Sequence, residues 1–476
     1  TCKEVMPVLD AFFRQYGEHM PVQVIGQTQA GNAALAAAFT PAFSILDDSA
    51  LQVSFAADIE TVPTLVRTDA TGAEITRLVG FVKDEWQAMS AQLDEATQQQ
   101  ALALNWSSLP QWRPGCGSLS VDPAHEPRLR AMAEGSPIRA RRIDVGSQDD
   151  EVEFMFDQGF SDGLPLVPPT PERVIAMLAG TSKDAQEVLG EMAPHMGVVT
   201  VEKVAINAVM AGCKPEYLPV VLAATEAILT DDYNIHGVMA TTMGASPVLV
   251  VNGPIRHRIG MNMGLGALGQ GNRANATIGR ALRLVIRNIG GAKPGETERS
   301  TLGNPMKFTM CFAEWEERNP WSPLHVERGF DKDDSVVTVF TMSSGPTLIV
   351  DQDSRSASQL AGTLGQGLQA VMSPKAYGAT DCLLVVVPEH VDTLMRGNYS
   401  KAELRQRIQE VSARPLRELV ADPQSGTGIK ADMAAQMDES TLNKMVSKFR
   451  RDDDIHIVVA GSEAGKFSGA FHGWVT

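Results

Sequence analysis

Cys382-Leu-Leu-Val-Val-Val387, followed by Pro388-Glu-His390, is the stretch that decides the fold class of the chain. An unbroken apolar run that ends at a proline is typical of a strand buried on both faces of a sheet. Similar apolar runs occur at 247–251, 336–340, 347–350 and 455–460. Because segments with helical spacing of apolar residues separate these runs, the sequence predicts an α/β fold.

The length and composition of the chain indicate more than one globular domain. The chain has 476 residues, of which 43% are hydrophobic and 21% charged, and a domain usually holds about 100–200 residues. Its apolar runs all fall short of the roughly 18 residues that a membrane span requires. The 57 Asp and Glu outnumber the 41 Lys and Arg and give a formal charge of −16. We therefore predict a soluble protein of two or three domains, with neither a membrane nor a nucleic-acid partner.

The cysteines indicate the redox compartment. They form an odd and widely spaced set, unlike the disulfide framework of a small secreted protein. The first residues lack the basic start and apolar stretch of a signal peptide, and the abrupt start leads us to expect an earlier segment before Thr1. We therefore predict reduced thiols and a cytoplasmic location. The five cysteines are Cys2, Cys116, Cys213, Cys311 and Cys382.

Residues 1–95 have the pattern of a small α/β domain. Val5, Leu9 and Phe12 recur on one face of a helix that begins near Cys2. Several short strand patterns follow, and the last two flank the turn Asp69-Ala-Thr-Gly72. The domain is therefore expected to close in a β-hairpin.

This order of elements resembles the thioredoxin superfamily, particularly its TlpA and peroxiredoxin-like members. The resemblance rests on Thr1-Cys2-Lys3 before a helix, on Val62-Pro63-Thr64, and on Gly80 after the hairpin. It implies that Cys2 is the second, resolving cysteine of a Cys-x-x-Cys pair at the start of a helix, where the helix dipole activates the first thiol. It also implies a cis-proline at Pro63, at the edge that binds substrate, and a thioredoxin reductase-type enzyme as electron donor.

The first strand and the attacking cysteine of that family have no counterpart in the sequence, so the domain is truncated at its start. Two interpretations stay open: these elements precede Thr1 in the parent protein, or the domain is inactive. We favour the first because the residues around Cys2 keep the family pattern. The parent protein should then have a cysteine three positions before Cys2.

Residues 96–150 have the composition of a connector. They are rich in Trp, Pro and Gly and include Gly115-Cys116-Gly117-Ser118. We interpret Cys116 as a spacer thiol, with a redox partner of the preceding domain as the alternative. The large α/β domain is then expected to occupy residues 151–476.

The large domain contains signs of internal repetition and one glycine-rich segment. Three of its expected strands end in similar loops, which favours repeated strand-loop units. Gly264, Gly266, Gly269 and Gly271 precede a helix, and such a loop can direct backbone N–H groups at an anion. The spacing fits neither a dinucleotide fold nor a phosphate loop.

We therefore expect a carboxylate, phosphate or similar anion at this segment. The candidate binding residues are Gly269, Gly271, Asn272, Arg273, Asn275 and Thr277. Arg280, Arg283 and Arg287 follow at helical spacing, and we favour surface ion pairs over ligand binding for them.

Further candidates for chemistry lie in a Pro- and Trp-rich stretch. Cys311 could act as a nucleophile with His325 as its base, since a thiolate near neutral pH needs an imidazole nearby. Alternatively, Cys311, Glu314 and His325 could bind a metal, although their spacing matches no known ligand pattern. The third alternative is a buried Cys311 with a hydrogen-bonded His325 and no chemical role. His236 is a candidate acid or base, and Cys213 could be activated by the helix that follows it.

Residues 157–476 also resemble bacterial proteins that carry a "UGSC-like" domain, a name taken from a selenocysteine-Gly-Ser-Cys motif. The resemblance rests on Asp162-Gly-Leu-Pro, on Val201-Glu-Lys, on Gly271-Asn-Arg-Ala-Asn-Ala-Thr and on Leu324-His-Val-Glu-Arg-Gly-Phe330. Cys116-Gly-Ser-Leu119 approaches the naming motif but lacks its second thiol. The resemblance implies kinship and no particular reaction.

Three hypotheses for function stay open at this point. The leading one is a thiol-dependent enzyme, an oxidoreductase or a lyase, in which the thioredoxin-like domain reduces a cysteine of the large domain, which acts on a small anionic substrate. The second is a lyase or hydrolase with one divalent metal and a protective redox domain, and the third is a non-catalytic thiol-binding or assembly factor. The cofactor is unknown, with none or one divalent metal expected, and an oligomer is a further open alternative.

Overall fold

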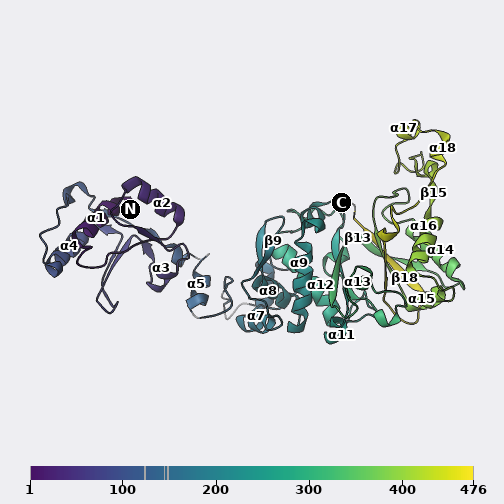
Figure 1. Cartoon of the computed structure of the whole chain (residues 1–476), viewed down its shortest axis with the longest axis horizontal. Coiled ribbons are helices and arrows are strands. Elements are labelled where there is room, and N and C mark those ends of the chain that lie inside the picture. Colours follow the sequence, from purple (N-terminus) through teal and green to yellow (C-terminus); the bar gives the residue numbers. More distant parts are fainter. Residues whose placement is uncertain (1, 123–124, 134, 144, 147–149, 475–476) are drawn as a thin grey trace. The chain divides into compact units, whose positions relative to one another are not determined.

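The chain folds into two compact units, residues 1–144 (unit 1) and residues 145–476 (unit 2), seen at the purple-blue and the teal-to-yellow ends of the colour scale in the computed structural model of Figure 1. The structure describes residues 2–122, 125–133, 135–143, 145–146 and 150–474. Across these residues, no helix is both long and apolar enough to cross a membrane.

Unit 1 is a small α/β unit of short elements. Its helices are α1 (Cys2–Tyr16), α2 (Gln29–Phe39), α3 (Gln52–Ala56), α4 (Lys83–Thr97) and α5 (Glu126–Ala133), with one-turn helices at Trp106–Ser108 and Leu119–Val121. Its strands are β1 (Val24–Gly26), β2 (Ile45–Asp47), β3 (Thr61–Val62), β4 (Thr64–Thr68), β5 (Glu74–Val79), β6 (Phe81–Val82), β7 (Trp112–Arg113) and β8 (Cys116–Gly117).

The core of unit 1 forms where α1 meets α4. The expected periodicity is confirmed for Val5 and Phe12, which are buried on the inner face of α1, and Tyr16 is buried there as well. Phe12 packs against Trp86 of α4 with the ring centroids 6.1 Å apart. The hydroxyl of Tyr16 donates to Asp94 Oδ1 over 2.7 Å. Aromatic burial therefore joins the first helix to the last long helix of the unit.

Strands β4 and β5 form the expected hairpin, and β1 pairs with β2 in parallel. The Val62–Pro63 peptide bond is cis, which is the geometry expected at Pro63. Residues 96–150, which we expected to be a connector, contain two strands that belong to the sheets of unit 1: β7 pairs with β6, and β8 pairs with β3. Leu102, Trp106 and neighbouring apolar side chains pack on the core of unit 1.

Unit 2 contains longer elements. Its helices are α6 (Glu151–Asp157), α7 (Pro171–Leu178), α8 (Val201–Ala211), α9 (Leu218–Ile228), α10 (Ile235–Ala240), α11 (Ile255–Arg258), α12 (Arg273–Asn288), α13 (Leu324–Glu327), α14 (Ala357–Leu368), α15 (Pro388–Met395), α16 (Lys401–Ser412), α17 (Ala431–Ala434) and α18 (Glu439–Leu442). Its strands are β9 (Val188–Met192), β10 (Gly197–Thr200), β11 (Ser246–Asn252), β12 (Cys311–Ala313), β13 (Val336–Val350), β14 (Cys382–Val386), β15 (Arg414–Pro415), β16 (Met445–Val446), β17 (Ile455–Val459) and β18 (Phe467–Gly473).

A six-stranded sheet with the order β12-β11-β13-β18-β14-β17 organises unit 2. The order consists of two equivalent halves: β11 is parallel to β12 and antiparallel to β13, just as β14 is parallel to β17 and antiparallel to β18. The two return strands, β13 and β18, pair with each other in the middle. The expectation of repeated strand-loop units therefore has a counterpart in the topology of the sheet.

The apolar runs of the sequence form the centre of this sheet. Every residue of β11 and β14 is buried, as expected for strands covered on both faces. The runs at 336–340 and 347–350 form one long strand, β13, instead of two separate strands. The mixed α/β class is confirmed by this arrangement.

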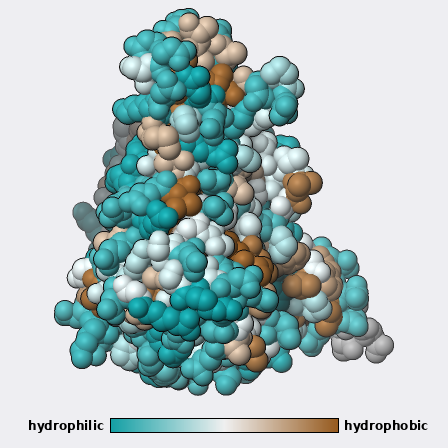
Figure 2. All heavy atoms as spheres, turned by 90° about the vertical axis from the view of Figure 1, so that its right-hand side faces the viewer, coloured by the Kyte–Doolittle hydropathy of each residue, from teal (hydrophilic) through white to brown (hydrophobic). Residues whose placement is uncertain are grey.

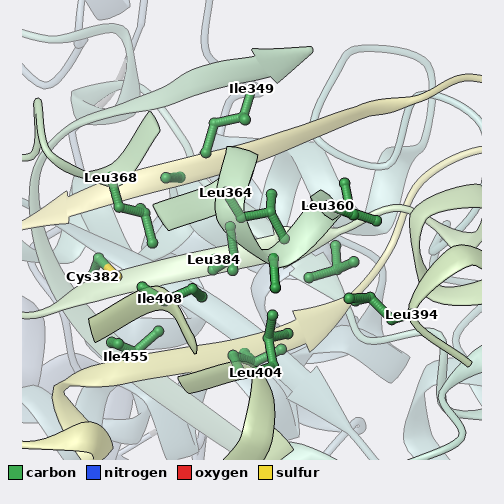
Figure 3. Close-up of a cluster of buried hydrophobic side chains, with 14 of the residues drawn as sticks. Ile349, Leu360, Leu364, Leu368, Cys382, Leu384, Leu394, Leu404, Ile408 and Ile455 are labelled. Atoms are coloured by element: carbon green, nitrogen blue, oxygen red, sulfur yellow. The ribbon is translucent and has the colours of Figure 1, made fainter. Parts of the chain in front are cut away.

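Two apolar layers lie on the two faces of the sheet. On one face, α14, α15 and α16 cover β14 and β17, and Figure 3 shows Leu364, Leu404 and Ile408 from the helices packed over Leu384 and Ile455 from the strands. On the other face, side chains from both halves, among them Val250, Phe312 and Phe471, share one core. The surface seen in Figure 2 is mostly hydrophilic with scattered apolar side chains.

Helix α12 lies beside the first half of the sheet. It packs against α8 and α9, as the teal region of Figure 1 shows, and against β12. Ten of its sixteen residues are buried, so this helix is part of the interior over most of its length. That position decides what its polar side chains can contact.

Candidate functional site

A cavity of about 630 Å³ opens beside α12 in unit 2. Such a volume lies within the usual range of sites that bind small molecules. Three parts of the chain form its wall: Asp162, the middle of α12, and the segment that follows α12. The lining residues are Asp162, Arg283, Arg287, Ala292, Pro294, Gly295, Glu298, Arg299, Ser300, Leu302, Gly303, Asn304, Pro305, Lys307 and Phe308.

The sequence of α12 explains why arginines reach this cavity. Asn272 caps the helix, because its side chain accepts a hydrogen bond from the N–H of Asn275. Ile278, Leu282 and Val285 are fully buried against the neighbouring helices and the sheet. Residues three and four positions apart share a face of a helix, so Arg283 and Arg287 point together into the cavity wall.

Arg283, Lys307 and Glu298 form a buried ionic group in the cavity wall. Lys307 Nζ lies 2.7 Å from Glu298 Oε1, and Arg283 Nη2 lies 3.4 Å from Glu298 Oε2. Arg283 Nε donates to the carbonyl of Lys307 over 2.9 Å, while Lys307 Nζ donates to the carbonyl of Ala245 over 2.9 Å. Two cations therefore share one carboxylate.

The electrostatics of this group favour a further anion. Desolvation lowers the pKa of Arg283, and desolvation together with the nearby Arg283 lowers the pKa of Lys307. Both shifts mean that burial makes the charged forms of these two side chains less favourable, and a bound anion would stabilise those charged forms. Around the whole cavity, four cationic side chains face two carboxylates.

Arg287 and Asp162 also line the cavity, and of these two only Arg287 adds an unpaired positive charge within the described residues. Arg287 Nε is buried and has no hydrogen-bond partner among the residues that the structure describes. The carboxylate of Asp162 is already neutralised by Arg280, whose Nη2 lies 2.8 Å from Asp162 Oδ1. A buried N–H donor without an acceptor is costly, so this position is suited to an anionic ligand.

The amide side chains that we expected to bind an anion at the glycine-rich segment have hydrogen-bond partners within the protein. Asn275 donates to the carbonyls of Asn262 and Ala267 over 2.8 and 3.1 Å, and Asn272 donates to the carbonyl of Gly260 over 2.8 Å. These amide groups are used to fix the loop on the start of α12. The loop is thus held at Gly260, Asn262 and Ala267 by side chains at the start of α12.

Two other expected binding residues of this segment also have internal partners. Arg273 Nε donates to the carbonyl of Gly212 over 2.9 Å, and Thr277 Oγ1 donates to the carbonyl of Arg273 over 2.8 Å. The structure brings them next to Cys213, whose thiol donates to the carbonyl of Thr277 over 3.4 Å. The hydrogen bonds that Arg273 and Thr277 donate are therefore internal to unit 2.

Cys311 does not lie in an irregular, exposed stretch. It begins strand β12 and is 4% exposed, and desolvation raises the pKa of its thiol far above the ordinary value. Among the described residues no hydrogen bond joins Cys311 to His325, which is fully buried with Nε2 3.3 Å from the carbonyl of Lys332 and Nδ1 without a hydrogen-bond partner. A core position raises the pKa of a thiol because the charged form is desolvated.

The metal hypothesis gains no support from the geometry. Within the described residues, no group of three or more His, Cys, Asp and Glu side chains is placed to hold a metal ion, and Cys311, Glu314 and His325 are no exception. Glu314 instead accepts hydrogen bonds from the side chains of Asn252 and Asn319 and from the N–H of Leu324. Desolvation raises the pKa of this carboxyl. It joins the ends of β11 and β12 to α13.

The remaining thiols of unit 2 are also buried. Desolvation raises the pKa of Cys213 to about 12, which is the opposite of activation by a helix dipole. Cys382 is fully buried in β14, and desolvation raises its pKa as well. His236 lies exposed on α10.

The two cysteines of unit 1 are more accessible. Cys2 begins α1 and is partly exposed, whereas Cys116 is exposed. In the antiparallel pair of β3 and β8, Cys116 lies directly opposite Val62, the residue before Pro63. The structure thus brings together two expected site residues, Cys116 and Pro63, that the sequence placed in different segments.

The cationic cavity itself was missed by sequence reasoning. The signal was present in Arg280, Arg283 and Arg287, which recur at helical spacing on an otherwise apolar helix. The expected ion pairs are present, since Arg280 pairs with Asp162 and Arg283 with Glu298. They are not surface pairs, because ten of the sixteen residues of α12 are buried. Comparisons with models of protein families, with curated proteins and with solved structures gave no significant match for this chain.

Proposed function

We propose that unit 2 binds a small anionic substrate in the cationic cavity beside α12 and is the catalytic unit of a thiol-linked enzyme. The observation that carries the proposal is Arg287, whose buried Nε lacks an acceptor in the described part of the chain. Arg283 and Lys307, which share Glu298, add to the positive charge. A carboxylate or phosphate would supply the missing acceptor and reduce the repulsion between these cations.

Binding of simple anions tests this proposal. Isothermal titration of the whole chain with phosphate, sulfate and acetate should give a single site, and Arg287→Gln should weaken it by a factor of about 10 or more. Arg273→Gln is the matched control, since it removes an arginine from the same helix outside the cavity. The thermal midpoint of each variant checks that it is folded.

The reverse pattern would contradict the proposal. If Arg273→Gln weakens anion binding and Arg287→Gln does not, the anion binds at the glycine-rich segment that the sequence indicated. If no anion binds to the wild-type chain, the cavity is not an anion site. A screen for turnover then separates an enzyme from a binding or assembly factor.

Unit 1 is proposed to be the thiol-disulfide module of the protein. What favours this is the exposed thiol of Cys116 beside the Val62–Pro63 bond, together with Cys2 at the start of a helix. The leading hypothesis from the sequence required unit 1 to reduce a cysteine of unit 2. The cysteines of unit 2, Cys213, Cys311 and Cys382, are all buried and offer no exposed thiol for that exchange. We therefore assign thiol exchange to unit 1 and substrate binding to unit 2.

Thiol exchange can be measured with a mixed-disulfide reagent such as oxidised glutathione. Cys116→Ser should remove most of the glutathione that the whole chain takes up, and Cys382→Ser should leave it unchanged. Equal uptake by the Cys116→Ser variant and the wild type would remove Cys116 from the proposed module.

A further inference from the structure

The cavity beside α12 holds more positive charge than its own carboxylates neutralise. Its lining contains four cationic side chains and two carboxylates. Asp162 is already paired with Arg280, which lies outside the lining, and Glu298 is shared by Arg283 and Lys307. With Arg280 counted, five cations face two carboxylates, an excess of three positive charges. A ligand with a single negative charge would leave most of this excess in place.

Three side chains of the lining have hydrogen-bond donors to spare. Arg287 Nε is buried and lacks an acceptor. Arg299 is exposed, and its side chain has neither a hydrogen bond nor an ion pair within the part of the chain that the structure describes. Ser300 Oγ accepts from the N–H of Gly303 over 3.1 Å, and its own O–H has no acceptor among the described residues. A ligand rich in acceptors would satisfy these donors.

A phosphoryl group matches both the charge and the donors. On a monoester it carries a charge of about −1.5 to −2 at pH 7 and presents three acceptor oxygens. A carboxylate carries one negative charge and has two oxygens. Arginine binds phosphate through pairs of parallel N–H···O bonds. The excess of charge and the free donors therefore favour a phosphoryl group over a single carboxylate.

The segment that carries two of these donors is anchored at both ends. Glu298 is held by its two ion pairs, and the N–H of Thr301 donates to the carbonyl of Thr242 over 2.9 Å. Arg299 and Ser300 lie between these two fixed positions. Because their backbone is already held, less conformational entropy is lost when a ligand contacts them.

We infer that the cavity binds the dianionic phosphoryl group of a small phosphate monoester. The inference rests on the proposed function, because it names the class of anion that the same cavity takes. The phosphoryl oxygens accept hydrogen bonds from Arg287, Arg299 and Ser300. The volume of about 630 Å³ leaves room for the organic part of the ester.

A set of matched anions tests the charge and the chemistry of the ligand. The whole chain is titrated calorimetrically at pH 7.5 with methyl phosphate, dimethyl phosphate, acetate and succinate. Methyl phosphate should bind at least about tenfold more tightly than dimethyl phosphate, which has the same phosphorus centre and one negative charge. Succinate, whose two charges lie on separate carboxylates, should bind more weakly than methyl phosphate. Phenyl phosphate should bind at least as tightly as inorganic phosphate, because the cavity has room for the ester group.

The pH dependence of binding identifies the charge state of the ligand. Methyl phosphate should gain affinity between pH 5 and pH 7.5, as it loses its second proton with a pKa of about 6. Sulfate is the control, since it is a dianion over this whole range.

The sulfate control also accounts for the protein groups that titrate near the ligand. Asp162, Glu298 and Lys307 line the cavity, and the ring of exposed His195 lies beside Gly291, which precedes a lining residue. The arginines of the lining stay protonated. Titration of any of these protein groups would change the binding of sulfate as well, so a rise seen with methyl phosphate alone belongs to the ligand.

Arg299→Gln tests the assigned contact without disturbing the interior. The variant should weaken methyl phosphate by about tenfold and reduce the ratio of its affinity to that of dimethyl phosphate. Arg258→Gln is the matched control, because it removes an exposed arginine of unit 2 that lies outside the lining. It should leave both affinities unchanged, and thermal midpoints check that both variants are folded.

The outcomes distinguish this inference from the proposal on which it rests. Acetate, dimethyl phosphate or succinate binding as tightly as methyl phosphate, or methyl phosphate and sulfate showing the same pH dependence, would overturn the phosphoryl assignment while the anion site stands. Exclusion of phenyl phosphate would overturn the assignment to a monoester. Unchanged binding in Arg299→Gln would overturn the assigned contact. Failure of every anion to bind would remove the proposed function itself.

Discussion

Arg280 and Asp162 form a two-point ion pair, with Nε 2.9 Å from Oδ2 and Nη2 2.8 Å from Oδ1. The side chains are 14% and 10% exposed. Through this pair the middle of α12 holds the segment before α7, which supplies one wall of the cavity. The pair therefore links the stability of unit 2 to the shape of the candidate site.

Asp162→Asn should destabilise unit 2 by about 2 kcal/mol, because it leaves the buried guanidinium of Arg280 without its charged partner. Glu187→Gln is the control, since the Lys183–Glu187 pair is exposed and should contribute less than about 0.5 kcal/mol. Urea unfolding at pH 7 measures both. Equal losses in the two variants would contradict the structural role of the Arg280–Asp162 pair.

The pH dependence of the same pair follows from the pKa of Asp162. Desolvation raises this pKa, but the hydrogen bonds and charge of Arg280 outweigh it, so the pKa is lowered in the folded state. For a lowered carboxyl pKa, the stabilisation is present above the unfolded pKa of about 3.9 and is lost as the pH falls below it. The difference in unfolding free energy between wild type and Asp162→Asn should therefore shrink in acid.

Cys311 should resist alkylation in the folded protein. Burial raises the pKa of its thiol, as it does for Cys213 and Cys382, so little thiolate forms between pH 7 and pH 9. Exposed Cys116 should be labelled first by iodoacetamide, and the three buried thiols should be labelled only after unfolding in urea. Mass spectrometry of the labelled peptides identifies each site.

Fast native labelling of Cys311 would restore it as a candidate nucleophile. The control is the urea-unfolded chain, in which all five cysteines should react at similar rates. If the other cysteines of the Cys311→Ser variant are labelled at the same rates as in the native wild type, their reactivity does not depend on Cys311.

Glu314→Ala should be among the most destabilising substitutions in unit 2, at about 3 kcal/mol or more. It would remove one acceptor from three donors: the amide of buried Asn252, which keeps Glu316 as a second acceptor, the amide of partly buried Asn319, and the buried N–H of Leu324. Glu314→Gln should cost less, because one amide oxygen remains. Thermal or urea unfolding of the two variants gives the comparison.

The raised pKa of Glu314 sets the direction of a pH effect. Between the unfolded pKa of about 4.3 and the higher folded pKa, the native state holds more protons than the unfolded state, so stability falls as the pH rises. The stability difference between wild type and Glu314→Gln should decrease through that window. A difference that grows with pH would mean that the folded pKa is lowered.

Lys448 should show a pH effect in the alkaline range. It is 1% exposed, donates to the carbonyls of Ser373 and Ala376, and lies over the ring of Tyr377. Desolvation lowers its pKa to about 8, below the unfolded value of about 10.4. The unfolded state therefore holds more protons between these two values, and stability gains from this group as the pH rises.

Lys448→Met isolates the contribution of that amine, because methionine keeps the length of the chain without its charge. Urea unfolding at pH 7 and at pH 9.5 should show wild type gaining relative to the variant at the higher pH. No change in the difference would mean that Lys448 titrates near its ordinary value in the folded protein.

The buried strands could be predicted from the sequence because burial on both faces leaves a mostly apolar run. Cys382–Val386 is apolar throughout, and Ile455–Val459 is interrupted only by His456. Strand β12 could not, since Cys311–Ala313 is only three residues long and lies beside Trp- and Pro-rich sequence. A strand this short carries no periodicity of its own. Its place in the sheet comes from pairing with β11.

The candidate site was harder to predict than the fold. The residues at the start of α12 have the composition of an anion site, but Asn272 and Asn275 use their amides to hold the loop. Arg283 recurs with Arg280 and Arg287 at helical spacing, a pattern that is common on exposed helix faces, yet Arg283 is buried in α12. Which partner a polar side chain finds depends on neighbours that are distant in sequence, such as Glu298 and Lys307.

The pairing of β13 with β18 has a consequence for how the protein is made. Its register joins Met342 to Gly473 and Val350 to Phe467, so the seam of the sheet depends on residues that a ribosome releases more than a hundred positions apart. Until the last of them emerges, β13 presents an open edge that can pair with another chain. Pairings so distant along the chain form slowly, and the growing polypeptide therefore carries this open edge until β18 has been synthesised.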